Sequence, residues 1–467
     1  MKQLQTAVHA ALKAWQTLDG TPTDLLEHLL IVQHERANAV ANAVANSVSN
    51  SPTTRRLMTN RVLHQGIERL QKQDPVAAQL LSSRFMDGDT MLMAAHRLQL
   101  SEDQAKRRQR EAIRQLTQIL WEQETAVRQA RLQQLHSQLP PAGYHQLFGT
   151  QEKVAELVQI LRNPNAPWVI AVVGIGGIGK TSLADAAVRA AIAHFDYAQL
   201  VWLRVLPDQP QDVANGILAE LAAQLCPDLP PSATAVQRDH QLRTTFKAAP
   251  HLVVIDNLET AVGMEQLLQK LNDFAHPSQF LLTTRVRLPA TTTAYNFLLH
   301  ELPPKAAADL VRHQAQNIGV QELASATDAD IHPIFAVTGG NPLAIKLIVG
   351  LAAVLPLPTI LADLKAAQLT EIEQMYRHIY WQAWHSLSPK AQALLEMMPL
   401  AGDIGLKPEQ MQTMWQLDQP TVLAATTELV NRSLLEVRGT IWERRYGIHR
   451  LTEAFLQSEI IHLPEVW

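Results

Sequence analysis

The stretch WVIAVVGIGGIGKTSLADAAV, which runs from Trp168 to Val188, joins an apolar run, a glycine-rich loop and a helix-compatible segment. Inside it, Gly174 to Thr181 match the pattern G-x-x-x-x-G-K-[ST]. A strand before this pattern and a helix after it are the context of a phosphate-binding P-loop. The glycines let backbone N–H groups turn toward a polyphosphate, and the N-terminus of the following helix adds partial positive charge.

Each residue type in this loop has a chemical task. The Lys180 side chain would reach the β- and γ-phosphates, and the Thr181 hydroxyl would ligate Mg²⁺. The sequence therefore predicts a nucleotide site for ATP or GTP with Mg²⁺. The candidate phosphate-binding residues are Gly174, Gly176, Gly177, Ile178, Gly179, Lys180, Thr181 and Ser182.

An acidic residue and an arginine follow at the ends of two later apolar runs. Asp256 closes the run Leu252 to Ile255, 76 residues after Lys180, where it would hold Mg²⁺ through the water shell. Asn257 stands where many such enzymes have another acidic residue, so Glu259 is the nearest carboxylate that could orient a water. Arg285, after Phe280 to Thr284, would read the γ-phosphate; the alternative is a surface arginine at a strand end.

Composition sets outer limits on the function. The chain has 467 residues, 47% hydrophobic and 18% charged, with a net charge of −4, which suits a globular multidomain protein without a globally basic surface. Cys226 is the single cysteine, which excludes an internal disulfide and a cysteine-based zinc site. Residues 347–360, the most apolar later window, are too short to span a bilayer and contain two prolines. We expect a cytoplasmic protein that does not enter the membrane.

The order of elements predicts a multidomain α/β fold. Residues 1–140 read as an all-helical module, and Pro140 to Gly143 mark a boundary. Four β-rich runs then alternate with helical segments, which predicts a parallel-sheet P-loop nucleotide-binding domain over residues 147–303. Helical residues 304–375 would form a small helical domain. Two short β-like runs among helices predict a winged helix over residues 376–467.

From Leu147 onward the chain resembles the NB-ARC type of STAND ATPases, which are related to AAA+ proteins. The resemblance rests on eight motifs in order: LFGTQEKVAELVQIL, GIGGIGKTSLA, FDYAQLVWLRV, LVVIDNLE, FLLTTR, ELPPKAAADLV, GGNPLAI and YGIHRLTEAFL. It implies that Phe148 and Gly149 lie near adenine, that Pro342 contacts the base or ribose, and that His449 touches the β-phosphate of ADP.

Two residues depart from the family pattern, and two assignments have plain structural alternatives. Thr150 follows Gly149 where the family commonly has arginine, and Arg450 follows His449 where it usually has aspartate. Pro342 also suits an ordinary helix start, and His449 also suits the surface of a winged helix.

Residues 80–120 read as a helix-turn-helix and resemble the one in region four of sigma factors and in related response regulators. Ser101 and Gln104 predict a capping box at the start of the second helix, which carries the DNA-contact candidates Lys106, Arg107, Arg108 and Arg110. Gln99 departs from the glycine usual in the turn. The alternative is a helix-turn-helix used for packing or for binding protein.

The resemblance implies an ATP/ADP-dependent switch for signal transduction. It would be closed with ADP, open or oligomerise with ATP, hydrolyse slowly, and regulate transcription if the helix-turn-helix binds DNA. A conventional turnover ATPase, or a DNA-binding regulator with a degenerate ATPase, remains an alternative. The family usually carries a C-terminal sensor array; here it would be missing, supplied by a partner, or part of a longer protein.

Overall fold

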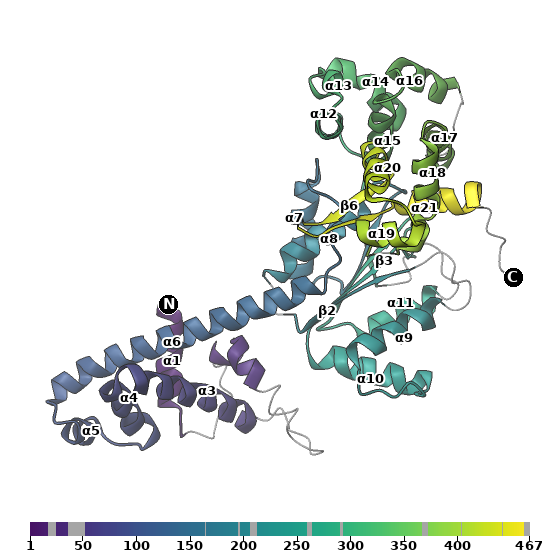
Figure 1. The fold of residues 1–467 in the computed structure, drawn as a ribbon. Coiled ribbons are helices and arrows are strands. Elements are labelled where there is room, and N and C mark those ends of the chain that lie inside the picture. The colour runs from purple at the N-terminus through teal and green to yellow at the C-terminus, as the bar shows by residue number, and fades with distance from the viewer. Residues whose placement is uncertain are drawn as a thin grey trace. The chain divides into compact units, whose positions relative to one another are not determined.

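We describe the protein from a computed structural model. It describes residues 1–16, 25–35, 52–163, 165–194, 197–205, 213–258, 264–289, 293–366, 372–402, 404–440 and 442–461. Glu259, a sequence candidate, lies outside these ranges. The chain divides into two compact units, residues 1–134 and 135–467 (Figure 1), and each unit is described by itself.

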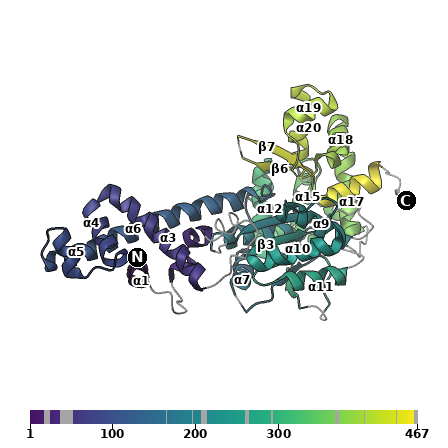
Figure 2. The same cartoon turned by 90° about the horizontal axis from the view of Figure 1, so that it is seen from below.

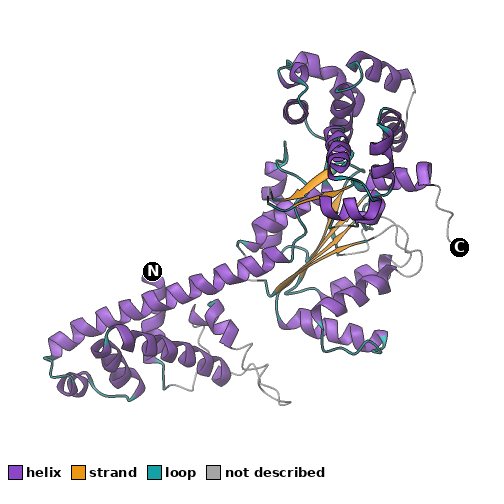
Figure 3. Cartoon of the chain, in the orientation of Figure 1, coloured by secondary structure: helices purple, strands orange, loops and turns teal. Residues whose placement is uncertain are grey.

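The described part of the first unit contains helices and no strand (Figure 3). Its core packs α3 against α6, where a Cβ at Gly66 would lie 2.8 Å from Leu116 Cδ1, so these helices approach closely. Buried Glu124 on α6 accepts hydrogen bonds from the backbone N–H groups of Leu30 and Ile31, at 3.2 and 3.1 Å. The elements are α1 (Lys2–Lys13), η1 (Leu25–His28), α3 (Pro52–Gln73), α4 (Pro75–Leu81), η2 (Ser82–Met86), α5 (Met91–Arg97) and α6 (Glu102–Ser137).

The second unit begins with a five-stranded parallel sheet in the order β2-β3-β4-β1-β5. The label β3 marks this sheet in Figures 1 and 2. β1, β3 and β4 are buried along their whole length, as expected for a parallel sheet covered on both faces. Alternate residues of β1 to β4 share a core with α9, α10 and α11, while α8 contacts β1 and β4 and packs on α7. The sheet elements are α7 (Gln151–Arg162), β1 (Val169–Val173), α8 (Lys180–Ile192), β2 (Gln199–Arg204), α9 (Val213–Leu225), α10 (Ala235–Ala248), β3 (His251–Asp256), α11 (Met264–Phe274), β4 (Gln279–Thr284) and β5 (Tyr295–Leu298).

The sequence predicted four strands, and the structure adds a fifth, β5. It pairs with β1 at one edge of the sheet, and only Phe297 of its four residues is buried. A short edge strand with a mixed burial pattern lacks the continuous apolar run that marked the other four.

In its described residues, the remainder of this unit is helical apart from one hairpin, and it is built around a large core that runs from Leu302 to Leu456. α15 and the end of α20 nearly touch, because a Cβ at Gly350 would lie 2.7 Å from the Arg432 carbonyl oxygen. The elements are α12 (Pro304–Ile318), α13 (Gln321–Ala324), α14 (Asp328–Thr338), α15 (Pro342–Ala352), α16 (Leu357–Ala366), α17 (Ile372–His385), α18 (Pro389–Glu396), η3 (Met398–Ala401), α19 (Pro408–Trp415), α20 (Gln419–Asn431), β6 (Glu436–Gly439), β7 (Arg444–Gly447), α21 (Arg450–Phe455) and η4 (Leu456–Ile461).

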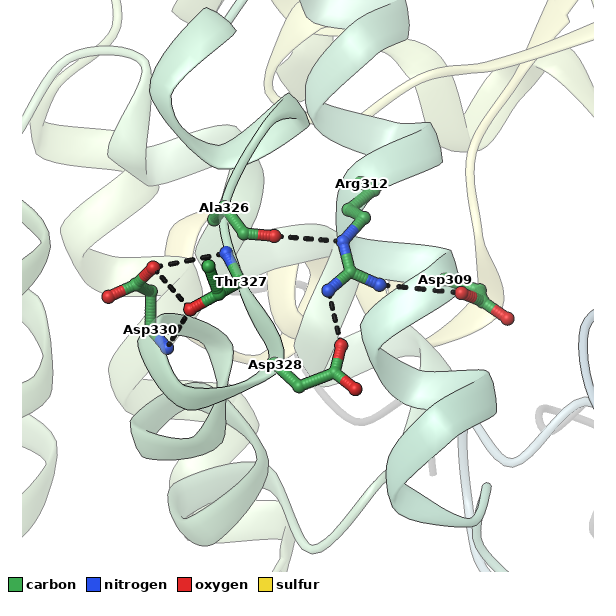
Figure 4. A network of polar contacts seen from close by, with 6 residues as sticks. All are labelled: Asp309, Arg312, Ala326, Thr327, Asp328 and Asp330. Carbon is green, nitrogen blue, oxygen red and sulfur yellow. Dashed lines mark hydrogen bonds and ion pairs between the residues drawn. The ribbon is translucent and has the colours of Figure 1, made fainter.

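Arg312 on α12 holds the connection between α13 and α14 (Figure 4). Its Nε donates to the Ala326 carbonyl at 2.9 Å, and its guanidinium pairs with Asp328. Thr327 and Asp330 then form a capping box that starts α14. This network fixes the helices that lead to the GGNPLAI segment.

Among the described residues, no single helix is both long and apolar enough to cross a membrane. The bent pair of α14 and α15 passes that test only by combined length and composition. The domain boundaries expected at 303/304 and 375/376 stay predictions; α17 continues through the second of them.

Candidate nucleotide site

The P-loop connects the carboxyl end of β1 to the first turn of α8. Gly177 and Gly179 adopt positive φ angles of 69° and 99°, a conformation that glycine reaches without a Cβ penalty. β3 and β4 run parallel to β1, so Asp256 and Thr284 reach the same edge of the sheet as the loop. The N-terminal turn of α8 thus lies at this edge, and a helix N-terminus favours an anion.

Lys180 lies back over the loop that precedes it. Its Nζ donates to the carbonyl oxygens of Gly174 and Ile175, at 2.9 and 3.0 Å. The side chain is largely buried, so its charge is held within the loop rather than in bulk solvent. A polyphosphate in the loop would therefore meet a preorganised ammonium group.

Thr181 and Asp256 come together as the sequence predicts for a metal site. Thr181 Oγ1 donates to Asp256 Oδ1 at 2.8 Å, and Thr283 Oγ1 donates to the same oxygen at 2.6 Å. A hydroxyl and a carboxylate side by side are the hard oxygen ligands that Mg²⁺ prefers. These two residues therefore suit a Mg²⁺ ion that accompanies the nucleotide.

Asn257 has a structural task. Its backbone N–H donates to Thr283 Oγ1 and its Nδ2 donates to the Val205 carbonyl, both at 2.8 Å. Its side-chain amide thus ties the end of β3 to the end of β2. Asn257 thus has a structural role at the position where many such enzymes have a second acidic residue.

A cavity of about 700 Å³ opens beside the P-loop. The loop lines one side, and the segment after β7, with β6, lines another. Four cationic side chains, with His449, face this space: Lys180, Arg204, Arg285 and Arg438. The acidic residues Asp185, Glu220, Asp256 and Glu436 line the same cavity. The P-loop with Lys180, rather than a surplus of positive charge, therefore suits the cavity to a nucleoside di- or triphosphate.

His449 contributes to the cavity as a neutral side chain. It caps α21, because its Nδ1 accepts a hydrogen bond from the Leu451 backbone N–H at 3.1 Å. Burial lowers the pKa of His449 to about 4; Glu436 opposes this shift, whereas Arg204, Lys346 and Arg438 add to it. With Nδ1 acting as the acceptor, the ring hydrogen is on Nε2, which leaves that nitrogen as a donor for an anion.

Glu436 and Arg438 form an ion pair beside His449. Arg438 Nη2 donates to Glu436 Oε2 at 2.7 Å. Burial alone would raise the pKa of Glu436, but the neighbouring positive charges, that of Arg438 above all, outweigh it and bring the pKa below its ordinary value. Glu436 therefore stays ionised and offsets part of the positive charge that faces the cavity.

The residues assigned to the adenine end lie elsewhere in the unit. Phe148 packs against His313 of α12 with ring centroids 5.1 Å apart, and a Cβ at Gly149 would lie 2.6 Å from Ala306 Cβ. Pro342 is the first residue of α15. Of the described residues that line the cavity, none is Phe148, Gly149 or Pro342. Their adenine contacts therefore stay predictions.

Sequence reasoning missed three residues near the P-loop. Arg204 ends β2 and is the strand neighbour of Asp256; the sequence predicted the strand but not its neighbour in the sheet. Asn341 and Tyr376 reach the loop from α15 and α17. No local sequence pattern indicates that these two residues contact the P-loop, because they lie 165 and 200 residues from their partner Gly176.

In the first unit, α5 and α6 are joined by a tight turn. Gln99 takes the left-handed conformation, with φ 54°, and so adopts the role in which glycine is usual. The capping box is confirmed, since Ser101 N donates to Gln104 Oε1 and Gln104 N donates to Ser101 Oγ. Whether these two helices bind DNA stays a prediction.

The four DNA candidates on α6 have different surroundings. Lys106 pairs with Glu102 at 2.7 Å, and Arg108 pairs at 2.6 Å with Asp74, the residue that caps α4. Arg107 and Arg110 are exposed. Exposed arginines suit contact with a phosphate backbone, whereas Arg108 already links two helices.

Comparison with known proteins agrees with this geometry. The model of the NB-ARC domain family matches residues 150–311, which contain the P-loop, Asp256 and Arg285. Residues 150–311 are an NB-ARC domain. The sequence-based assignment to the NB-ARC type of STAND ATPases is thereby confirmed, and this domain implies nucleotide binding, usually with Mg²⁺.

Two curated relatives are named regulatory protein AfsR, from Streptomyces griseus and Streptomyces coelicolor. Each is 29% identical over 185 residues, which are 38% of this chain but only 18% and 17% of the relatives. A solved STAND protein with a tetratricopeptide repeat sensor, from Pyrococcus horikoshii, is 18% identical with a TM-score of 0.43. The match covers 67% of this chain and 43% of that one.

Proposed function

We propose that this protein is a signal-transduction switch that is closed when it binds ADP and opens or oligomerises when it binds ATP. The observation that carries the proposal is the shared cavity: His449 and Arg438, from the C-terminal part, face it together with Lys180 of the NB-ARC domain. A ligand that contacts both parts only when they are docked stabilises the docked arrangement, because those contacts are missing when the parts separate. Bound ADP would thus hold the C-terminal part in place.

The γ-phosphate is the feature that distinguishes ATP from ADP, and Arg285 is the residue proposed to read it. Its guanidinium carbon lies 3.5 Å from the position a Cβ would take at Gly176, directly beside the P-loop. Mg²⁺, when held at Thr181 and Asp256, would neutralise part of the phosphate charge. Hydrolysis would be slow and would reset the switch.

The first test is the nucleotide content of the purified protein, released by heat and separated by chromatography, together with its mass in solution. Co-purified ADP on a monomer, and a larger particle after exchange for a non-hydrolysable ATP analogue, are the expected results. Rapid ATP turnover by a standing oligomer would favour the conventional ATPase instead. An identical shape and mass with both nucleotides would reject the switch.

DNA binding through α5 and α6 is a second proposal that adds to the first. It is supported by exposed Arg107 and Arg110 near the start of α6, and by the regulatory proteins among the relatives. A footprint on a specific DNA sequence would support it. Absence of DNA binding even at low salt, where phosphate attraction is strongest, would reject it. The cytoplasmic location remains a prediction from sequence.

A further inference from the structure

Two carbonyl groups in the middle of the P-loop accept hydrogen bonds from segments far along the chain. Asn341 Nδ2 donates to the Gly176 carbonyl at 3.0 Å, and the Leu343 backbone N–H donates to the Gly177 carbonyl at 3.4 Å. The hydroxyl of Tyr376 lies 3.2 Å from the Gly176 carbonyl and donates to Asn341 Oδ1 at 2.6 Å. The loop is therefore held from behind by α15 and α17.

The contact is tightly packed. Asn341 is fully buried and Tyr376 is 3% exposed. A Cβ at Gly177 would lie 2.3 Å from the Tyr376 hydroxyl oxygen and 2.9 Å from Leu343 Cβ. Gly177 is thus required twice, by its positive φ and by the approach of these side chains.

Asn341 uses its whole amide. Its Oδ1 accepts from the backbone N–H groups of Leu343 and Ala344, which caps α15, and also from Tyr376. Its Nδ2 is thereby aimed at the P-loop. Burial, reinforced by Tyr380, raises the pKa of Tyr376, so the phenol keeps the hydrogen that it donates. An aspartate at position 341 would keep the cap but lose the donor.

The geometry of the peptide bond gives this contact a consequence for the ligand. In a planar trans peptide the C=O and the N–H point in opposite directions. Bonds that hold the carbonyls of Gly176 and Gly177 toward α15 and α17 therefore turn the N–H groups of Gly177 and Ile178 the other way. Gly176 and Gly177 line the cavity, so the N–H of Gly177 would be turned toward a phosphate there, with that of Ile178 next to it in the loop.

We propose that Asn341 and Tyr376 are positioning residues that fix the P-loop peptides for phosphate and so couple nucleotide affinity to the docking of α15 and α17. This inference rests on the proposed function only in taking ADP as the ligand. Neither residue touches the nucleotide in this scheme. Both act through the orientation of the Gly176 and Gly177 peptides.

The experiment measures ADP dissociation from the full chain with a fluorescent ADP analogue, beside the thermal midpoint without nucleotide. Asn341→Asp keeps the helix cap and removes the donor, and Tyr376→Phe removes only the hydroxyl. We expect each to speed ADP dissociation, about three- to tenfold, which corresponds to one neutral hydrogen bond. Asn341→Asp should have the larger effect because it sets a carboxylate against a carbonyl.

Tyr380→Phe is the matched control. Tyr380 is also buried on α17. Its hydroxyl accepts a hydrogen bond from Thr452 Oγ1 at 3.1 Å and, unlike that of Tyr376, does not lie against a P-loop carbonyl. It should lower the thermal midpoint about as much as Tyr376→Phe while leaving ADP dissociation unchanged. Equal ADP dissociation from the Tyr376 and Tyr380 variants would overturn the inference and leave the switch standing. A wild-type chain that binds no adenine nucleotide would overturn both.

Discussion

Replacement of His449 separates its cap of α21 from its proposed contact with phosphate. Asparagine is among the best N-cap residues, so His449→Asn keeps an acceptor for the first turn of α21 but is too short to replace the imidazole as a donor. His449→Ala removes both. Because the pKa of His449 lies at about 4, the wild-type side chain is neutral at pH 7 and donates from Nε2.

The expected size follows from the bond that is lost. A hydrogen bond to a charged group contributes about 1.5–3 kcal/mol, so ADP affinity should fall about ten- to a hundredfold in His449→Asn. His449→Ala should lose the same affinity and in addition about 1 kcal/mol of stability, the usual contribution of a helix cap. Isothermal titration with ADP gives the first quantity, and chemical denaturation without nucleotide gives the second.

Asp418→Ala is the control for the cap alone. Asp418 caps α20 in the same part of the chain, where it accepts from the Thr421 backbone N–H, and it does not line the cavity among the described residues. This variant should lose stability while keeping ADP affinity. An ADP affinity of His449→Asn within twofold of the wild type would refute the phosphate contact.

Three further outcomes are expected. The pKa of His449 is below its ordinary value of 6.5, so between pH 6.5 and pH 4 the unfolded chain binds more protons than the folded one. The free energy of unfolding should therefore be constant above pH 6.5 with respect to this group and fall toward pH 4, by up to about 1.4 kcal/mol per pH unit. Denaturation of wild type and His449→Asn across this range measures the difference. Thr181→Val keeps the shape but loses the hydroxyl beside Asp256, so adding Mg²⁺ should no longer tighten ADP binding in titrations with and without chelator. Arg107→Ala should weaken binding to duplex DNA in fluorescence anisotropy without changing stability. Arg108→Ala removes the ion pair with Asp74 at a partly exposed site, so it should lower the stability of the first unit by at most about 1 kcal/mol.

The sequence was informative where the signal is local. The P-loop, the apolar strand before Asp256 and the capping box at Ser101 each fit within about ten residues, and the structure contains all three elements. The same holds for the parallel sheet, whose central strands are continuous apolar runs. β5 was not predicted, because an edge strand needs no continuous apolar run and because its pairing with β1 depends on tertiary structure.

The surroundings of the P-loop could not be predicted in the same way. The contacts of Asn341 and Tyr376 with Gly176 depend on how α15 and α17 pack against the P-loop. Neither residue belongs to the P-loop sequence motif. Arg204 is a milder case: its place at the end of β2 was visible, but its facing the cavity depends on the strand order. His449 was found through the family resemblance, since a histidine before a short helix has no phosphate signal of its own.

The hydrogen bonds around the P-loop set the size of the proposed switch. Opening would break the bonds from Asn341 and Leu343 to the loop, at about 0.5–1.5 kcal/mol each, and the contact of His449 with phosphate, at about 1.5–3 kcal/mol. The first two bonds form without a ligand and favour the closed form in any case, so of these contacts ADP itself adds only that of His449, against about 5.5 kcal/mol for a shift from one per cent to ninety-nine per cent. Since coupling between binding and docking is reciprocal, a variant that weakens the contact of α15 and α17 with the P-loop should also weaken ADP binding, whereas one that only destabilises these helices need not. Asn341→Asp and His449→Asn should therefore both shift the protein toward the open form without ATP.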